Sequence, residues 1–213
     1  MTLLLPDSDV VAAYRGLVGR VTELVTSVTE ADGDLPVPHC PSWTVRDVVS
    51  HMVGVVEDIL AGRMEGVTTE AWTAAQVDRH RTDSLAGLLT VWAAAMTEFE
   101  AILPHIPSPV NSQLVMDAVS HEHDLRHALR RPGARDSDAV RVAVGWLLDS
   151  AENKQVGLGE ELRSQPIDDF DLLRVLSGRR SLAQAIDLGL HAETIVSLLA
   201  GTPLTSPWSS IDE

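Results

Sequence analysis

The amino-acid sequence predicts an all-α protein, in which four long antiparallel helices form a bundle and a small helical extension follows. Apolar residues recur every three or four positions over long stretches, and proline and glycine interrupt this pattern mainly between those stretches. No segment shows the alternation of apolar and polar residues that is typical of a half-buried strand. We therefore expect a bundle over residues 1–155 and a C-terminal helical extension over residues 156–213.

Residues 9–30 place eight apolar side chains at helical spacing, which predicts a long amphipathic first helix. The stretch 31–42 contains one glycine and three prolines, and we interpret it as a loop. Thr44 and Asp47 then have the spacing of a capping box, in which each side chain accepts a hydrogen bond from the other residue's backbone amide. A second helix should therefore begin there and end near Gly62.

Residues 63–82 are less periodic, and we expect only a connector with a short helical piece around Trp72. Beyond it, apolar residues again recur at spacings of three and four, and prolines mark the ends of the periodic segments. These patterns predict three further helices, over approximately residues 85–103, 110–131 and 137–153.

The rhythm changes after about residue 157, where the apolar clusters become shorter. One short helix is predicted over residues 170–176, because Gly178 can end it in the left-handed conformation. Two more are expected over residues 180–187 and 190–200. The proline- and serine-rich end of the chain indicates a tail without regular structure.

The chain has 213 residues, with 31 acidic against 16 basic side chains and a formal net charge of −15. This charge would repel nucleic acid and anionic membranes, so we expect a small-molecule substrate instead. No apolar run reaches the length of a membrane span, and the first residues lack a basic leader, so we expect a cytoplasmic protein. A homodimer is a further possibility that the sequence leaves open. Cys40 is the single cysteine, which excludes an intramolecular disulfide and a thiolate metal cluster.

Polar residues on the inner faces of the predicted helices are the strongest functional signal. Asp117 and His121 fall four residues apart within the apolar stripe of the fourth long segment, so both project from one face. His51 lies among the valines and the isoleucine of the second helix. An antiparallel bundle can bring these two helices together, and the three side chains are then candidate ligands of one divalent metal.

Two neutral imidazoles and one carboxylate can bind zinc, nickel or ferrous iron and leave coordination positions open, as catalytic sites require. Zinc is the metal that we favour. Nearby carboxylates would be needed to orient the imidazoles, and the candidates are Asp124, Asp47 and Glu122.

Plainer interpretations of the same residues stay open at this point. His51 could be a hydrogen-bonded core histidine, and Asp117 with His121 could be an ordinary helix pair. Cys40 fits a small structural side chain better than a reactive thiol, and the tryptophans fit core packing better than a ligand cage. The sequence assigns no catalytic residue.

Three segments resemble, in this order, the motifs of the mycothiol-dependent maleylpyruvate isomerase family of the DinB-like superfamily. The first is Cys40-Pro41-Ser42-Trp43-Thr44-Val45-Arg46-Asp47-Val48-Val49-Ser50-His51. The second runs over residues 117–133 with its His121-Glu122-His123-Asp124 core, and the third runs over residues 170–181. Together they span most of the chain.

The resemblance implies a DinB-like four-helix bundle with a divalent metal held by His51, His121 and Asp117. It also implies a low-molecular-weight thiol cofactor, mycothiol or a similar thiol, whose sulfur would bind the metal and whose pKa would fall. Arg174 and Arg179 could contact the thiol or an anionic substrate, although pairing with the chain's own carboxylates is the alternative.

The function expected from these observations is a metal- and thiol-dependent transferase or isomerase that acts on a small electrophile. The characterised isomerase has a separate α/β domain, whereas the stretch 152–168 shows no strands here. The sequence therefore offers little support for maleylpyruvate isomerisation itself. The alternatives are a non-catalytic ligand-binding or sensing module on the same bundle, or a member that has lost its metal.

Overall fold

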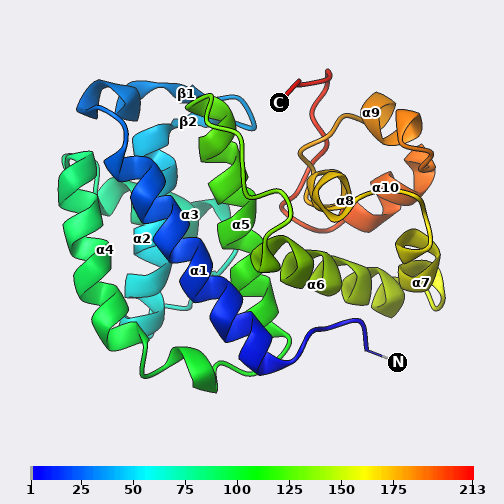
Figure 1. The fold of residues 1–213 in the computed structure, drawn as a ribbon, viewed down its shortest axis with the longest axis horizontal. Helices are drawn as coiled ribbons and strands as arrows, with labels where there is room; N and C mark the ends of the chain where they lie inside the picture. Colours follow the sequence, from blue (N-terminus) through cyan, green and yellow to red (C-terminus); the bar gives the residue numbers. More distant parts are fainter. Residues whose placement is uncertain (1) are drawn as a thin grey trace. The chain divides into compact units, whose positions relative to one another are not determined.

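A computed structural model describes residues 2–213 and confirms the all-α class (Figure 1). Helices contain 63% of the chain, and the strands among the described residues form one small two-stranded sheet. The helices predicted over residues 9–30, 44–62, 85–103, 110–131 and 137–153 are present, with ends that shift by a few residues. They are α1 (Asp7–Thr26), α2 (Val45–Ala61), α4 (Leu85–Phe99), α5 (Val110–Ala128) and α6 (Asp138–Lys154).

The shorter helices also follow the predicted order. The helical piece expected around Trp72 is present, and so are the three short helices expected near the end of the chain. They are α3 (Glu70–Arg79), α8 (Asp169–Leu176), α9 (Leu182–Asp187) and α10 (Ala192–Leu199), with a 3-10 turn at Leu103–His105.

The contacts between Cα atoms group the chain into two compact units. The first unit contains the residues up to Leu17, Pro107–Ser120 and Gly133–Glu213. The second unit contains Val18–Ile106 and His121–Pro132, so the continuous helices α1 and α5 contribute to both. The division that the sequence predicts between residues 155 and 156 stays a prediction.

In the second unit, α2 packs against both α3 and α4. Its start is fixed as the sequence predicts: the Asp47 amide donates to Thr44 Oγ1 at 3.3 Å, and the Thr44 amide donates to Asp47 Oδ2 at 2.8 Å. Gly62 ends the helix in the left-handed conformation, with φ at 67°. Most of the residues that α2 buries are apolar, and three polar ones are buried with them: Ser50, His51 and Asp58.

The segment that the sequence assigns to a loop before α2 is more ordered than expected. It contains a 3-10 turn at Glu30–Asp34 and an antiparallel hairpin of β1 (Pro36–Val37) and β2 (Cys40–Thr44). The prolines and the length of these strands, two and five residues, hide any alternation from the sequence. Because β2 ends at the N-cap of α2, it places Cys40 and Trp43 directly ahead of that helix.

In the first unit, α6 packs against α7 and α8, and α10 packs against α8 and α9. Helix α7 (Leu158–Arg163) is absent from the sequence-based prediction, because six residues are too few to show a helical period. Gly178 has the left-handed φ that the sequence predicts, at 73°. Residues 203–213 form neither helix nor strand, as expected of the tail.

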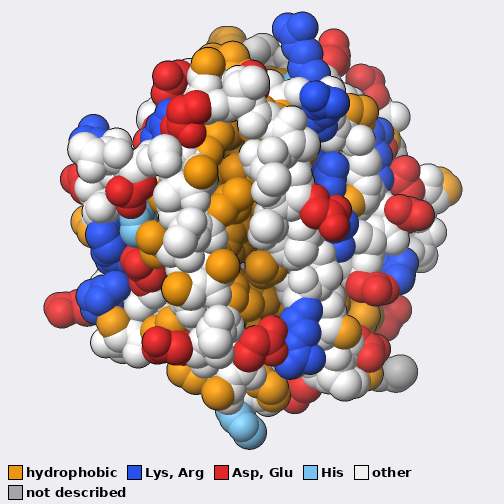
Figure 2. Space-filling model, turned by 60° about the vertical axis from the view of Figure 1, so that its left-hand side comes forward, with side chains coloured by type: hydrophobic (Ala, Val, Ile, Leu, Met, Phe, Trp, Pro, Cys, Tyr) orange, Lys and Arg blue, Asp and Glu red, His pale blue; other side chains and the backbone are white. Residues whose placement is uncertain are grey.

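Acidic and basic side chains are interspersed on the face shown in Figure 2, with apolar side chains gathered in a strip near its centre. Among the described residues, no helix combines the length and the apolar character needed to cross a lipid bilayer.

Candidate metal centre

Two buried imidazoles from different helices lie together in the second unit. His51 on α2 and His121 on α5 have ring centroids 5.0 Å apart, with their planes at 78°. Asp117 precedes His121 by one turn of the continuous helix α5, so the two side chains leave the same face of that helix. The structure therefore brings His51 and His121 together, as the sequence analysis expects for the helices that carry them.

A chain of hydrogen bonds fixes the orientation of His51. Its Nδ1 lies 2.7 Å from Gln76 Oε1, and Gln76 Nε2 donates to Asp58 Oδ2 at 2.8 Å. Asp58 also accepts hydrogen bonds from Arg63 Nε at 2.7 Å and from Arg79 Nη2 at 2.6 Å. Burial would raise the pKa of Asp58, but the hydrogen bonds from Gln76, Arg63 and Arg79 outweigh it and lower that pKa.

This chain determines which nitrogen of His51 carries the proton. An ionised Asp58 only accepts hydrogen bonds, so the amide NH₂ of Gln76 must face it and the amide oxygen must face His51. That oxygen accepts, and His51 Nδ1 therefore donates. A neutral imidazole protonated at Nδ1 has its lone pair at Nε2, which is the form that coordinates a metal.

Gln76 reaches His51 because α3 approaches α2 unusually closely. A methyl group at Gly54 would lie 2.5 Å from Gln76 Cβ, closer than any ordinary contact. Gly54 therefore makes room for the fully buried Gln76 side chain. The sequence analysis missed Gln76; it lies four residues after Trp72 in the predicted helical piece, but that segment is otherwise mostly exposed and weakly periodic.

His121 has an acidic neighbour on its own helix. Asp124 Oδ2 lies 3.2 Å from His121 Nδ1, and the Asp124 side chain is completely buried. Cys40 Sγ contributes a long contact of 3.5 Å to the same Asp124 oxygen. The residue that the sequence offers as an orienting carboxylate thus lies beside a ligand candidate, within ion-pair distance of its imidazole.

The structure gives the other two predicted orienting carboxylates different partners. Asp47 completes the capping box of α2. Glu122 is completely buried and accepts hydrogen bonds from Arg20 at 2.7 and 2.9 Å and from Arg126 at 2.9 and 3.0 Å. An uncharged residue, Gln76, takes the place beside His51 that the sequence analysis reserves for an acid.

Two tryptophans form an aromatic wall beside the imidazoles. The Trp43 ring lies 5.2 Å from His51 and 5.8 Å from His121, measured between centroids. Trp72 meets His51 edge-on at 6.3 Å, and its Nε1 donates to the Arg63 carbonyl oxygen. The packing role predicted for the tryptophans holds for the buried Trp92, whereas these two also contact the His51 ring.

Two further features bear on the choice of ligands. Ligand atoms of Cys40, His121 and Asp124 lie within 4.8 Å of one another and form a second group that could hold an ion.

In the first unit, burial and then the charge of Asp117 raise the pKa of the completely buried Tyr14 phenol. The Asp117 carboxylate is therefore close to the Tyr14 phenol.

The two arginines proposed from the sequence as thiol or substrate contacts bind parts of the chain itself. Arg174, which has no exposed surface, donates to both carboxylate oxygens of Glu213, at 2.7 and 2.9 Å. Arg179 Nη1 donates to the Ser177 carbonyl oxygen at 2.8 Å. For Arg174, pairing with an internal carboxylate, the alternative raised above, is the observed arrangement.

Comparison with known proteins assigns this bundle to a family. Residues 14–132 match the family described as the mycothiol maleylpyruvate isomerase N-terminal domain. The match spans more than half of the chain and includes His51, Gln76, Asp117 and His121. Searches of curated proteins and of solved structures gave no significant match. The chain therefore belongs to the mycothiol maleylpyruvate isomerase N-terminal domain family.

Proposed function

We propose that the chain binds one divalent metal, zinc most readily, through His51, His121 and Asp117. The metal would serve thiol-dependent transferase or isomerase chemistry on a small electrophilic substrate, with mycothiol or a similar thiol as cofactor. The observation that carries the proposal is the chain from His51 through Gln76 to Asp58, because it holds the imidazole in the metal-binding tautomer. Family membership supports the thiol.

The residues present fit such an ion. Two imidazole nitrogens and one carboxylate oxygen are ligands that zinc accepts, and three protein ligands leave room for a further one. When bound, the metal would supply the positive charge that lowers the pKa of a coordinating thiol. The protein's own contribution is orientation: Gln76 keeps the proton on His51 Nδ1, and Trp43 covers both imidazoles.

Metal content of the purified protein tests the site directly. Elemental analysis should find about one zinc, nickel or iron per chain, since three ligands define one site. His51→Ala and His121→Ala should each lose the metal and keep their helical circular dichroism. His105→Ala, at an exposed histidine in the same unit, is the matched control and should keep the metal. Full metal content in both centre variants, or none in the wild type after reconstitution, contradicts the proposal.

Cobalt substitution separates the proposed ligands from the group that contains Cys40. A cobalt ion bound by nitrogen and oxygen alone lacks the sulfur-to-metal charge-transfer band that a thiolate ligand produces. We expect no such band in the wild type, and Cys40→Ser should leave the visible spectrum unchanged. A near-ultraviolet band that disappears in Cys40→Ser would assign the ion to Cys40, His121 and Asp124 instead.

Turnover distinguishes the enzyme from a binding module. The metal-loaded protein should accelerate conjugation or isomerisation of at least one substrate in a panel of small electrophiles, with mycothiol present and not without it. His121→Ala should abolish this acceleration. Saturable ligand binding without turnover of any substrate would favour the non-catalytic module.

A further inference from the structure

The Glu213 side chain is enclosed by arginines in the first unit. Arg174 binds both of its carboxylate oxygens, and Arg180 Nη1 donates to Oε1 at 2.6 Å. Arg174 is completely buried and Arg180 is only 8% exposed. Charge-assisted pairs with this fork geometry are typical of sites that recognise carboxylates.

Both arginines are held by groups other than Glu213. Arg174 Nη1 also donates to the Ser120 carbonyl oxygen at 3.3 Å. Arg180 Nη2 donates to Asp171 Oδ1 at 3.1 Å. Removal of the Glu213 carboxylate would therefore leave both guanidinium groups in place and take a bidentate anion away from the buried Arg174, which favours the binding of another anion there.

An aromatic ring supports the same cluster. The Arg135 guanidinium lies 4.5 Å from the centroid of the Phe170 ring, and that of Arg180 lies 6.0 Å from it. Arg135 Nη2 also donates to the main-chain oxygen of Glu213 at 3.2 Å. The arginine site, defined as Arg135, Arg174 and Arg180, is thus built on α8 and its neighbours rather than on the segment that ends in Glu213.

The segment that carries Glu213 also makes polar contacts with α9 and its N-cap. Ser210 Oγ lies 3.0 Å from Ser181 Oγ, and Gln184 Nε2 donates to the Ile211 carbonyl oxygen at 3.1 Å. Residues 203–213 are mostly exposed and have no regular secondary structure. A segment of this kind can leave the arginine site without disturbing a helix.

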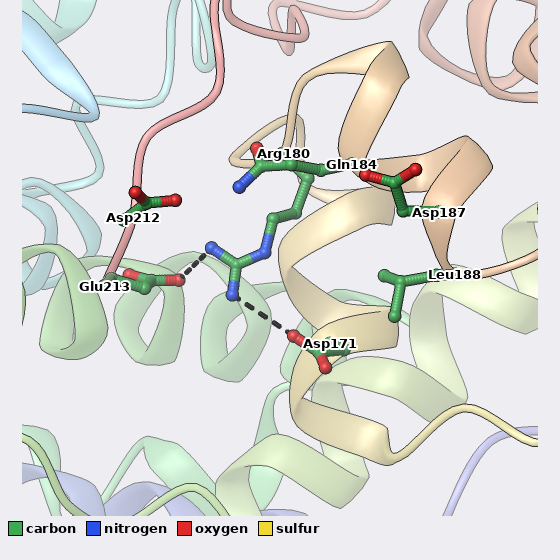
Figure 3. A pocket seen from close by; sticks show the side chains of 7 residues that line it. All are labelled: Asp171, Arg180, Gln184, Asp187, Leu188, Asp212 and Glu213. Atoms are coloured by element: carbon green, nitrogen blue, oxygen red, sulfur yellow. Dashed lines mark hydrogen bonds and ion pairs between the residues drawn. The ribbon is translucent and has the colours of Figure 1, made fainter.

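Beside the arginine site lies an open pocket of about 270 Å³ (Figure 3). In this view the Arg180 side chain extends between Glu213 and Asp171, and Asp187 lies across the pocket on α9. Four of the seven lining residues are acidic, and the full set is Asp171, Arg180, Gln184, Asp187, Leu188, Asp212 and Glu213. A ligand whose carboxylate replaced that of Glu213 would place its remaining atoms next to carboxylates.

We propose that the arginine site binds a small zwitterion of the amino-acid class, and that Glu213 occupies this site as a built-in competitor. The ligand carboxylate would bind Arg174 and Arg180, and its ammonium group would face Asp171 and Asp187, the two acids of the pocket that do not lie on the segment that carries Glu213. This binding activity is separate from the thiol chemistry proposed above and does not depend on a metal.

Isothermal titration of the full chain with three small probes tests this proposal. L-Alanine carries both charged groups, acetate carries only the carboxylate, and ethylamine carries only the ammonium group. Glu213→Gln removes the competing charge with little change of shape. It should bind L-alanine about tenfold more tightly than the wild type does, because a tethered competitor acts at millimolar effective concentration.

Control probes and control variants test whether both charged groups of the ligand and the arginine site are needed for binding. Acetate should bind Glu213→Gln more weakly than L-alanine, and ethylamine should not bind. Glu193→Gln, an exposed acid in the same unit, should behave as the wild type. Adding Arg180→Gln to Glu213→Gln should abolish binding. If Glu213→Gln does not fold, Glu213→Asp, which shortens the competitor and keeps its charge, should show a smaller gain.

Two results overturn the proposal. One is L-alanine affinity in a folded Glu213 variant that equals that of Glu193→Gln. The other is a Glu213 variant that loses stability and recovers none of it in millimolar L-alanine, which would make Glu213 a structural clamp only.

Discussion

The side-chain oxygen of Gln76 lies 2.7 Å from Nδ1 of His51, although 25 residues separate them in the chain. Because the Gln76 amide nitrogen is committed to Asp58, this oxygen has a fixed direction and the imidazole has a fixed tautomer. The proposed metal centre therefore depends on α3, a short helix that supplies none of the ligands. The first two predictions concern this dependence.

Gln76→Leu should weaken zinc binding by about 10- to 100-fold, since a ligand imidazole that loses its hydrogen-bond acceptor is no longer oriented. Competition with a chromophoric chelator measures the affinity. Gln155→Leu, at an exposed glutamine, is the control and should bind zinc as the wild type does. An affinity within twofold of the wild type in Gln76→Leu would show that Gln76 does not position His51.

Gly54→Ala should lower the free energy of unfolding by about 1–3 kcal/mol, because the added methyl group overlaps the Gln76 side chain in a packed core. Gly19→Ala is a matched control, since nothing lies within 4 Å of the added methyl group on α1. That change should stabilise the helix by about 0.5–1 kcal/mol. Urea denaturation measures both; equal values for the two variants would contradict the close approach of α3.

The lowered pKa of Asp58 predicts a stability contribution that acid removes. A carboxyl whose pKa is lower in the folded state contributes stability above its unfolded pKa of about 3.9, and this is lost as the pH falls through the folded value. Asp58→Asn should therefore be less stable than the wild type at pH 7, and this difference should shrink below about pH 4. Urea denaturation from pH 7 to pH 3 checks this. A difference that does not change with pH would contradict it.

Glu122→Gln should destabilise the protein without removing its metal. The buried carboxylate is bound by Arg20 and Arg126, both partly exposed, so we expect a loss of about 2–4 kcal/mol, somewhat below the cost for a fully buried pair. Glu98→Gln, at an exposed acid, should change stability little. Metal loss from folded Glu122→Gln would support the orienting role that the sequence predicts for Glu122.

The sequence was sufficient for features that depend on neighbours along the chain. Helical periodicity predicted the long helices, the Thr44–Asp47 spacing predicted the start of α2, and Gly178 predicted a left-handed residue. The relation of Asp117 to His121 has the same origin, because backbone hydrogen bonds four residues apart fix which side chains share a face. The sequence analysis missed the hairpin before α2 and helix α7, because each element is too short to show a repeating pattern of apolar residues.

The partners of the functional side chains were decided only by tertiary structure. Nothing in the spacing of His51, Gly54 and Gln76 indicates that α3 lies against α2, and nothing near Arg174 indicates that Glu213 binds it. Hydrogen bonds between distant residues depend on how helices pack, and packing depends on side-chain shape at many positions at once. Local periodicity therefore determined which residues face inward, whereas close packing determined what each of them meets there.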